Sequence, residues 1–154
     1  MRTLDKVCLK VKMLEHAIIE PTYATSGSAG MDLPAAIPGP IYLKPMERVA
    51  VPTGLIFEVP QGYEVQVRAR SGLSIKQGLC LANGVGTIDS DYRGEVKVLL
   101  VNLGDKTYTI NPGDRIAQAI ILPIALAELQ IVPELTETQR SSGGFGSTGI
   151  TITT

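Results

Sequence analysis

The sequence predicts an all-β domain of the sandwich or jelly-roll class, and three observations indicate that class. The 16 glycines and 10 prolines are spread along the 154 residues instead of gathering in a linker, as in proteins built from many short strands. Two segments alternate apolar and polar residues with the period of a strand. Only one short segment has the flanking residues of a helix.

The expected strands follow one another along the chain. Segments 7–13 and 63–69 alternate between apolar and polar side chains, so each is expected to expose one face to water. Residues 87–89 and 95–97 flank a turn and are expected to pair as a hairpin. Shorter apolar runs, separated by prolines and by Gly113, predict six further strands at 41–43, 48–51, 55–59, 96–101, 107–110 and 116–122.

The one expected helix is residues 71–77, which follows Arg70 and ends before Gly78. The last segment is different, because glycine and serine dominate it and leave few side chains that could pack against a core. We therefore divide the chain into a jelly-roll domain, 1–136, and a flexible glycine-rich C-terminal arm, 137–154.

Charge and residue scarcity exclude several classes of function. Lys plus Arg is 14 and Asp plus Glu is 15, so the net charge of −1 provides no basic surface for nucleic acid. The chain has one histidine, His16, and two cysteines, Cys8 and Cys80, which is a poor supply for a zinc site or a Ser-His-Asp mechanism. Acid–base catalysis is therefore expected to rest on carboxylates.

No segment predicts a membrane span or an export signal. Residues 1–13 alternate lysines with apolar residues and form no apolar core. The most apolar run, 116–129, contains Gln118 and Pro123 and is too short to cross a hydrocarbon layer of about 30 Å. We expect a soluble, cytoplasmic protein with no membrane partner.

Four stretches carry residue types suited to chemistry. Asp32 follows a glycine-rich approach, and residues 70–73 bring an arginine and a serine to a helix start, where free N–H groups suit a phosphate. An arginine beside an N-capping serine is the structural alternative there. Residues 83–95, with Asp89, suit a small planar ligand, although a turn whose acids cap backbone N–H groups fits the same pattern. Phe145 lies among glycines, where a ring is expected to stack on a ligand.

Five motifs follow one another in order along the chain: Gly30-Met31-Asp32-Leu33, Arg70-Ser71-Gly72, Gly86-Thr87-Ile88-Asp89-Ser90-Asp91-Tyr92-Arg93-Gly94, Gly113-Asp114-Arg115-Ile116-Ala117-Gln118 and Gly143-Gly144-Phe145-Gly146-Ser147-Thr148-Gly149. Taken together, they resemble the motifs of the trimeric deoxyuridine triphosphatase (dUTPase) family, over residues 22–149. Ala69 stands where that family usually has proline, and Ser141 where it usually has glycine; neither change affects a group that does chemistry.

This resemblance implies a distorted jelly roll of the β-clip type, with one short helix, assembled as a homotrimer with shared active sites. It implies hydrolysis of dUTP to dUMP and pyrophosphate with Mg²⁺, a reaction that keeps uracil out of DNA and supplies dUMP for dTMP synthesis. The arm of one chain would cover an active site built by the other chains.

The resemblance also implies roles for particular residues. Asp89 would activate the attacking water, and Asp32 would hold Mg²⁺ through water. Contacts to the phosphates are implied for Arg70, Ser71, Gly72, Gln118, Arg140, Ser147 and Thr148. Contacts to the rest of the substrate are implied for Asn83, Gly86, Thr87, Ile88, Asp89, Tyr92, Lys97, Phe145 and Gly146. Structural roles are expected for Asp91, Arg93, Asp114 and Arg115, the last by orienting a catalytic carboxylate from behind.

Two other functions fit the same fold. The first is a dCTP deaminase, or a bifunctional deaminase and triphosphatase, which would need a different acid in the pocket and usually a longer chain. The second is a jelly-roll module without catalysis, which would be expected to lose Asp89 or the arginine of the arm. Ammonia release from dCTP distinguishes the first alternative from a dUTPase.

Overall fold

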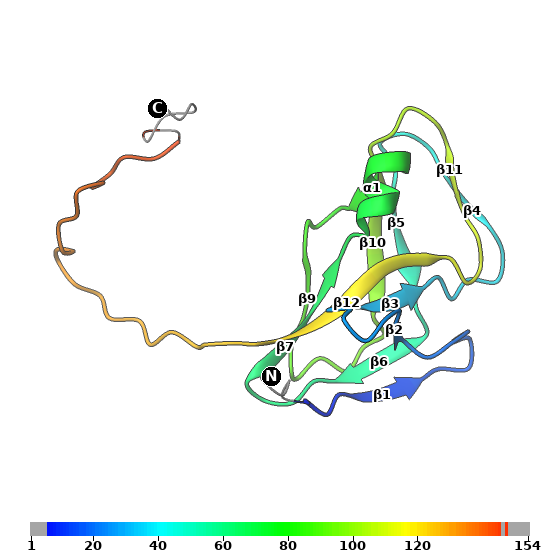
Figure 1. The fold of residues 1–154 in the computed structure, drawn as a ribbon, viewed down its shortest axis with the longest axis horizontal. Coiled ribbons are helices and arrows are strands. Elements are labelled where there is room, and N and C mark those ends of the chain that lie inside the picture. Colours follow the sequence, from blue (N-terminus) through cyan, green and yellow to red (C-terminus); the bar gives the residue numbers. More distant parts are fainter. Residues whose placement is uncertain (1–5, 146, 148–154) are drawn as a thin grey trace.

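The computed structural model describes residues 6–145 and 147. Over this part of the chain, twelve β-strands and one α-helix form a body from which the C-terminal segment extends (Figure 1). The elements are β1 (Lys10–Met13), β2 (Thr22–Tyr23), β3 (Met31–Pro34), β4 (Ile41–Leu43), β5 (Arg48–Pro52), β6 (Leu55–Glu58), β7 (Tyr63–Arg68), α1 (Ser71–Gln77), β8 (Leu79–Leu81), β9 (Gly86–Ile88), β10 (Lys97–Asn102), β11 (Tyr108–Ile110) and β12 (Arg115–Pro123).

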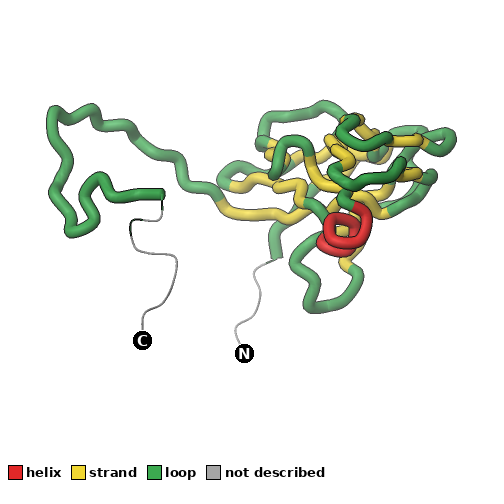
Figure 2. The backbone as a smooth tube through the Cα atoms, turned by 90° about the horizontal axis from the view of Figure 1, so that it is seen from above, coloured by secondary structure: helices red, strands yellow, loops and turns green. Residues whose placement is uncertain are grey.

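The strands form a set of antiparallel sheets, which confirms the all-β expectation. The largest sheet has the order β2-β3-β12-β7-β9, and β5, β10 and β8 form a second sheet. β1 pairs with β6, and β4 pairs with β11. Figure 2 shows the helix α1 at one side of this body of strands. Because strand β12 lies between β3 and β7, three segments far apart in sequence meet at the centre of the largest sheet.

The alternating pattern of β7 places its apolar side chains in the core. Val65 and Val67 are fully or almost fully buried, whereas Glu64, Gln66 and Arg68 point to the other face and are half-buried. These three form a polar ladder, in which Gln66 Nε2 donates to Glu64 Oε1 at 2.7 Å and Arg68 Nη2 donates to Gln66 Oε1 at 2.6 Å. The strand thus stabilises the core on one side and presents bonded polar groups on the other.

Helix α1 has the bounds that the sequence predicts. It ends at Gly78, whose φ of +69° is the left-handed conformation that glycine adopts at helix ends. A side chain at Gly78 would also meet the backbone of Gly104, so the residue is required for close approach as well as for its dihedral angle.

Two expectations about strands are wrong. Residues 87–89 and 95–97 do not pair as a hairpin, because β9 pairs with β7 and the Val96 N–H and C=O groups are bonded to residues 53–55. The strand expected over residues 7–13, with one face exposed to water, begins only at Lys10 as β1. Its apolar face is not buried either, because Val11 and Met13 are 38% and 40% exposed. It pairs with β6 alone, and its apolar side chains line a shallow groove at the edge of the body.

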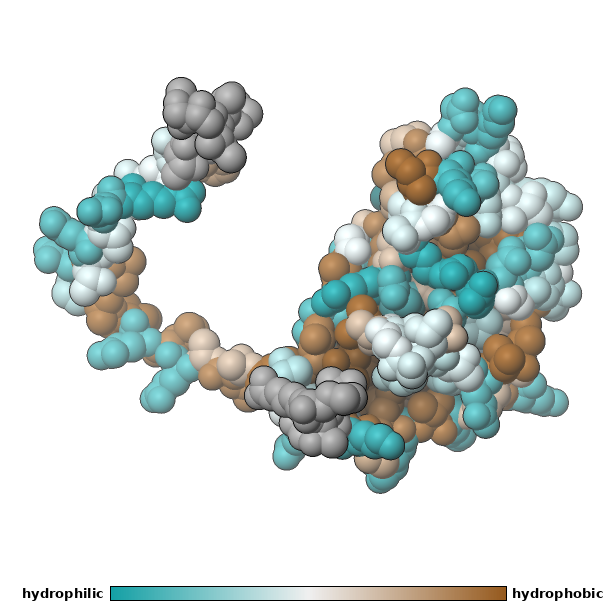
Figure 3. Space-filling view, viewed as in Figure 1, coloured by the Kyte–Doolittle hydropathy of each residue, from teal (hydrophilic) through white to brown (hydrophobic). Residues whose placement is uncertain are grey.

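The segment after β12 extends away from the body (Figures 1 and 2). Its apolar side chains are exposed, with Leu126 90% and Ile131 99% exposed, and the space-filling view shows hydrophobic atoms along this segment (Figure 3). Within one chain, therefore, nothing covers these side chains among the described residues. None of the described helices is long and apolar enough to span a membrane.

Candidate functional site

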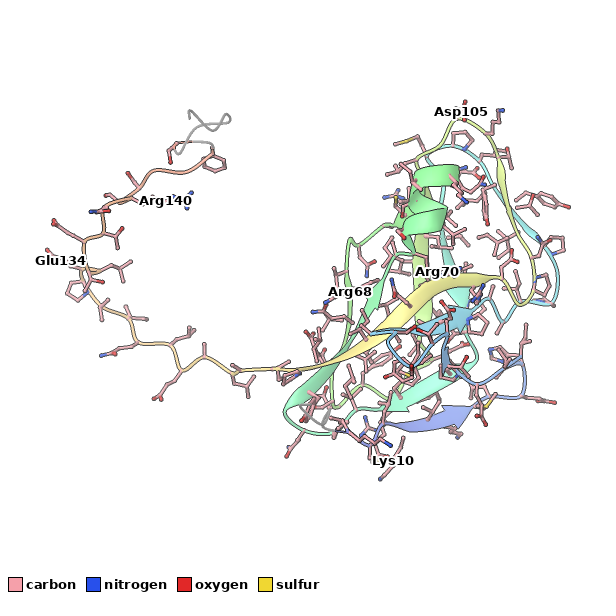
Figure 4. The ribbon with its side chains drawn as sticks, viewed as in Figure 1. Lys10, Arg68, Arg70, Asp105, Glu134 and Arg140 are labelled. Carbon is pink, nitrogen blue, oxygen red and sulfur yellow. The ribbon has the colours of Figure 1, made fainter. Side chains whose placement is uncertain are left out.

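One cavity, which we call the Arg70 cavity, gathers charged and polar side chains where β3, β12 and α1 meet. Its volume is about 430 Å³, and its lining includes Asp32, Arg70, Ser71, Gly72, Lys76 and Gln118. The register of the largest sheet brings them together, because Gln118 lies opposite Asp32 on one side and Arg68 on the other. Figure 4 shows Arg70 beside β12 below α1, and Figure 3 shows hydrophilic atoms gathered in this region.

Asp32 lies between two arginines. Arg70 Nε is 3.1 Å from Asp32 Oδ1, and Arg115 Nη1 donates to Asp32 Oδ2 at 2.9 Å. The Asp32 side chain is only 17% exposed, so these guanidinium groups fix its orientation in a partly desolvated setting. Arg70 also donates through Nη1 to Arg115 O at 2.9 Å. Arg115 therefore contacts Asp32, the carboxylate expected to hold Mg²⁺, and not Asp89, the carboxylate expected to be catalytic.

Gln118 is held in place by a backbone contact and by the absence of a side chain at Gly30. Its Nε2 donates to Ala69 O at 3.0 Å. A Cβ on Gly30 would lie 2.6 Å from Gln118 Oε1 and 3.2 Å from Ile120 Cγ1. Gly30 is therefore required for the position of Gln118, a constraint that the sequence shows only as a glycine in a motif.

The start of α1 leaves its first N–H groups without a side-chain cap. The N-cap is Arg70, with extended φ and ψ of −95° and 124°, and Leu73 N and Ser74 N donate to its carbonyl oxygen. Ser71 is the first helical residue, so the alternative of an N-capping serine is wrong. The exposed Ser71 and Gly72 line the cavity, where N–H groups and positive charge suit an anion.

A second cavity, the β9–β10 cavity, has a different character. It has a volume of about 270 Å³, and strand ends and one ring line it: Val67, Asn83, Gly86, Thr87, Ile88, Tyr92, Glu95, Val96, Lys97 and Leu99. Tyr92 Oη donates to Glu95 O at 3.1 Å, which fixes the ring. A Cβ on Gly86 would lie 3.1 Å from Val67 Cβ and 3.3 Å from Asn83 Nδ2, so the strand runs close to both.

Glu95 also lines this cavity, although no pattern in the sequence singles it out. Its Oε1 accepts from Gly54 N at 2.8 Å and lies 2.7 Å from His16 Nε2. Burial by itself would raise the pKa of the Glu95 carboxyl, but the hydrogen bonds from His16 and Gly54 and the charge of Lys97 lower it below its usual value. Glu95 is therefore an ionised, hydrogen-bonded part of the cavity wall.

Asp89 lines neither of these cavities. It is exposed and opens onto a third cavity of about 910 Å³, together with Tyr63, Glu64 and Asp91. Beside it, Arg93 Nη1 donates to the carbonyl oxygens of Ser90 and Tyr92, a structural role as expected. One chain therefore does not bring Asp89 together with Arg70 and Asp32.

The residues expected in the arm are also far from these cavities. Figure 4 shows Arg140 on the extended segment, well separated from Arg70, and the Phe145 ring is fully exposed. Ser147 is exposed as well. Gly146 and Thr148 lie outside the described residues.

The Arg70 cavity offers a divalent cation a single carboxylate. No group of three or more His, Cys, Asp or Glu side chains converges anywhere in residues 6–145. Mg²⁺ usually keeps several waters and takes one or two carboxylates together with phosphate oxygens of a ligand. Asp32, which lines the cavity and is held by two arginines, fits that mode and not an all-protein cage.

The chain is similar to known proteins over nearly all of its length. The sequence pattern of the dUTPase family matches residues 16–149. The deoxyuridine 5'-triphosphate nucleotidohydrolase of Aquifex aeolicus is 57% identical over 148 residues, which cover 95% of this chain and 99% of that protein. That of Brucella melitensis biotype 2 is 55% identical over 145 residues, covering 92% of each chain.

Two solved structures extend the similarity to three dimensions. A mutant dUTPase of Staphylococcus bacteriophage 80alpha, with dUpNHpp, has a TM-score of 0.85 at 28% identity and covers 94% of this chain and 100% of its own. A mutant dUTPase from phage phi11 of S. aureus, whose structure reveals the coordination of a structural Mg(II) ion, has a TM-score of 0.75 at 28% identity. It covers 83% of this chain and 98% of its own.

Proposed function

The chain belongs to the dUTPase family and is a dUTP diphosphatase, and from that premise we propose how its residues divide the work of hydrolysing dUTP. The observation that carries the proposal is the contrast between two cavities. The Arg70 cavity is rich in cationic side chains, and the β9–β10 cavity is lined by strand ends and the ring of Tyr92. A nucleoside triphosphate has two parts that match these cavities: its polyanionic triphosphate suits the cationic cavity, and its planar base suits the other.

The triphosphate binds in the Arg70 cavity. Arg70, Ser71 and the Gly72 N–H contact the inner phosphates, and Gln118 adds a polar contact from β12. Asp32 would hold Mg²⁺ through water, and the bound ion would neutralise negative charge on the phosphate oxygens. Because Arg115 and Arg70 fix both oxygens of Asp32, the carboxylate needs no rearrangement when the substrate arrives.

The uracil and deoxyribose bind in the β9–β10 cavity. Main-chain groups of Gly86, Thr87, Ile88 and Lys97, with the Asn83 amide, complement the edge of uracil and not that of cytosine. A buried donor or acceptor left without a partner costs about 1–3 kcal/mol, so two or three mismatches reject cytosine strongly. Tyr92 packs against the sugar and excludes a ribose 2′-OH.

Asp89 is the general base. Its carboxylate accepts a proton from water as the water oxygen attacks phosphorus, the bridge between the α- and β-phosphates breaks, and pyrophosphate leaves. A base of this kind contributes typically about 10²–10⁴-fold to the rate. Exposure of Asp89 in the single chain suits a carboxylate that reaches a substrate held partly by another chain.

The site is shared between subunits of a homotrimer. In one chain, Asp89 and the Arg70 cavity are separate, and the apolar side chains of Leu126, Leu129 and Ile131 in the segment after β12 are almost fully exposed. The arm of another chain would supply Arg140, Ser147 and Thr148 to the outer phosphate and Phe145, with Gly146, to the base. Stacking of a ring on a base is worth about 1–3 kcal/mol.

Pyrophosphate release from dUTP, dCTP, dTTP and UTP, with and without Mg²⁺, tests this proposal. We expect rapid release from dUTP alone, dependent on Mg²⁺, and none above background from the other three. Release of ammonia from dCTP would support the deaminase alternative instead, and no turnover of any nucleotide would support a module without catalysis.

A further inference from the structure

The wall of the β9–β10 cavity at residues 95–97 is held from outside the cavity. Val96 N donates to Leu55 O at 2.8 Å, and Val96 O accepts from Thr53 Oγ1 at 2.7 Å. Thr53 is fully buried, so this contact is shielded from water. The position of the wall therefore depends on the turn at residues 53–55, which joins β5 to β6.

The Glu95 side chain ties the same wall to the same turn. Its Oε1 accepts from Gly54 N at 2.8 Å, and the side chain is only 17% exposed. The same oxygen lies 2.7 Å from His16 Nε2; because a carboxylate only accepts, the imidazole is the donor. One carboxylate oxygen thus joins three segments, two of which lie outside the cavity.

The segment that carries His16 packs directly on this turn. Leu14 N donates to Gly54 O at 2.8 Å, and Gly54 has a φ of +72°. A Cβ on Gly54 would lie 2.5 Å from Ala17 Cα, so the turn and the 14–17 segment are in close contact. His16 is the residue of that segment whose side chain reaches the cavity wall, 79 residues further along the chain.

We propose that His16 is a positioning residue for nucleotide binding, which acts through Glu95 to fix the wall of the β9–β10 cavity. This inference depends on the proposed function, in which that cavity binds the uracil nucleoside. His16 does not line the cavity itself, and it contacts neither Asp89 nor the Arg70 cavity. Its loss should therefore weaken nucleotide binding and leave the chemical step unchanged.

The test compares five variants in the intact assembled enzyme. His16→Ala should raise KM for dUTP about two- to fivefold with kcat unchanged, the size expected of one half-exposed charged hydrogen bond. His16→Gln retains an N–H donor and should keep KM close to the parent value. Lys10→Ala is the matched control, because it removes an exposed ion pair with Glu58 from the same N-terminal segment without touching the wall. The double variant Glu95→Gln/His16→Ala should have a KM close to that of Glu95→Gln alone, because both substitutions remove the same contact.

A second measurement observes the contact without activity. The chain has one histidine, so the imidazole NMR signals of the protein belong to His16. They should shift in Glu95→Gln, stay unchanged in Lys10→Ala, and shift when dUMP is added to the parent protein.

The outcomes separate this inference from the proposed function. A parent enzyme that turns over no dUTP contradicts both. An active parent with unchanged KM in His16→Ala, with equal losses in His16→Gln and His16→Ala, or with the same loss in Lys10→Ala, contradicts the role of His16 alone. Imidazole signals that do not change in Glu95→Gln also overturn it.

Discussion

Replacement of Gly30 by alanine tests whether the close packing of the Gly30 backbone against the Gln118 side chain sets the position of Gln118 in the Arg70 cavity. The new Cβ would lie 2.6 Å from Gln118 Oε1 and 3.2 Å from both Gln118 Cβ and Ile120 Cγ1. The amide can rotate away, but then Gln118 Nε2 loses its 3.0 Å hydrogen bond to Ala69 O. Gly30→Ala should therefore displace the Gln118 side chain from its position in the Arg70 cavity.

The magnitude follows from these contacts. Loss of the hydrogen bond lowers the free energy of unfolding by about 0.5–1.5 kcal/mol, and an off-rotamer glutamine adds a similar amount. Alanine also restricts the unfolded chain, which offsets about 0.4–1 kcal/mol of this loss, so the net destabilisation is about 0–2.6 kcal/mol, with a midpoint of about 1.3 kcal/mol. Activity should fall further, with kcat/KM reduced about tenfold or more, because Gln118 no longer contacts a charged phosphate.

Gly27→Ala is the matched control for Gly30→Ala. Gly27 lies in the same glycine-rich approach, its φ is not positive, and a Cβ there would meet nothing within 4 Å. Thermal unfolding and steady-state kinetics with dUTP should show the control close to the parent protein. If the two variants behave alike in both assays, the close approach at Gly30 does not position Gln118 and the reasoning is refuted.

Four further predictions concern the base, the arm, acid stability and the cavity wall. Asp89→Asn should reduce kcat by about 10²–10⁴-fold and leave the Kd for dUTP nearly unchanged by calorimetry; turnover within a few-fold of the parent would show that Asp89 is not the base. Truncation after Gln139 should preserve assembly and Tm but lower kcat/KM severely, with Phe145→Ala between the two; full activity of the truncated protein would contradict a role for the arm. Because the folded-state pKa of Glu95 is lowered, its contribution to stability is complete above the unfolded pKa of about 4.5 and disappears as pH falls through the folded value. Glu95→Gln should therefore make the loss of stability below that pH less steep in an acid titration followed by circular dichroism. Thr53→Val removes the donor to Val96 O and should lower the free energy of unfolding by about 1–3 kcal/mol in denaturant titrations, whereas a value near zero would mean that this buried bond contributes nothing.

The parts of the fold that short-range pattern controls were predictable from sequence. Helix α1 has the predicted bounds because Gly78 supplies its left-handed end, and β7 follows the period of two. The hairpin between residues 87–89 and 95–97 was wrong for a long-range reason. Val96 is bonded to residues 53–55, about forty positions earlier, and no local pattern contains that information.

The same distinction applies to the site. Asp32, Arg70 and Gln118 could be selected because they lie in recognisable motifs, and the sheet brings all three to one cavity. His16 and Glu95 are 79 residues apart and belong to no shared motif, so only the folded structure joins them. In the proposed shared site, the positions of Asp89 and of the arm relative to the Arg70 cavity depend on other copies of the chain, which the sequence of one chain does not order in space.

In the proposed enzyme, one active site combines the Arg70 cavity of one chain with the β9–β10 cavity and Asp89 of another. Mixing subunits of two inactive variants tests this arrangement. Asp89→Asn and Arg70→Ala proteins are each expected to be nearly inactive alone. When the two are unfolded, mixed in equal amounts and refolded together, about one site in four should combine an intact Arg70 with an intact Asp89 by random assortment.

The mixture should recover pyrophosphate release from dUTP to a substantial fraction of the refolded parent enzyme. Each variant refolded alone is the control and should stay inactive. A mixture no more active than the separate variants, although mixed trimers are demonstrated by mass spectrometry, would contradict the shared site.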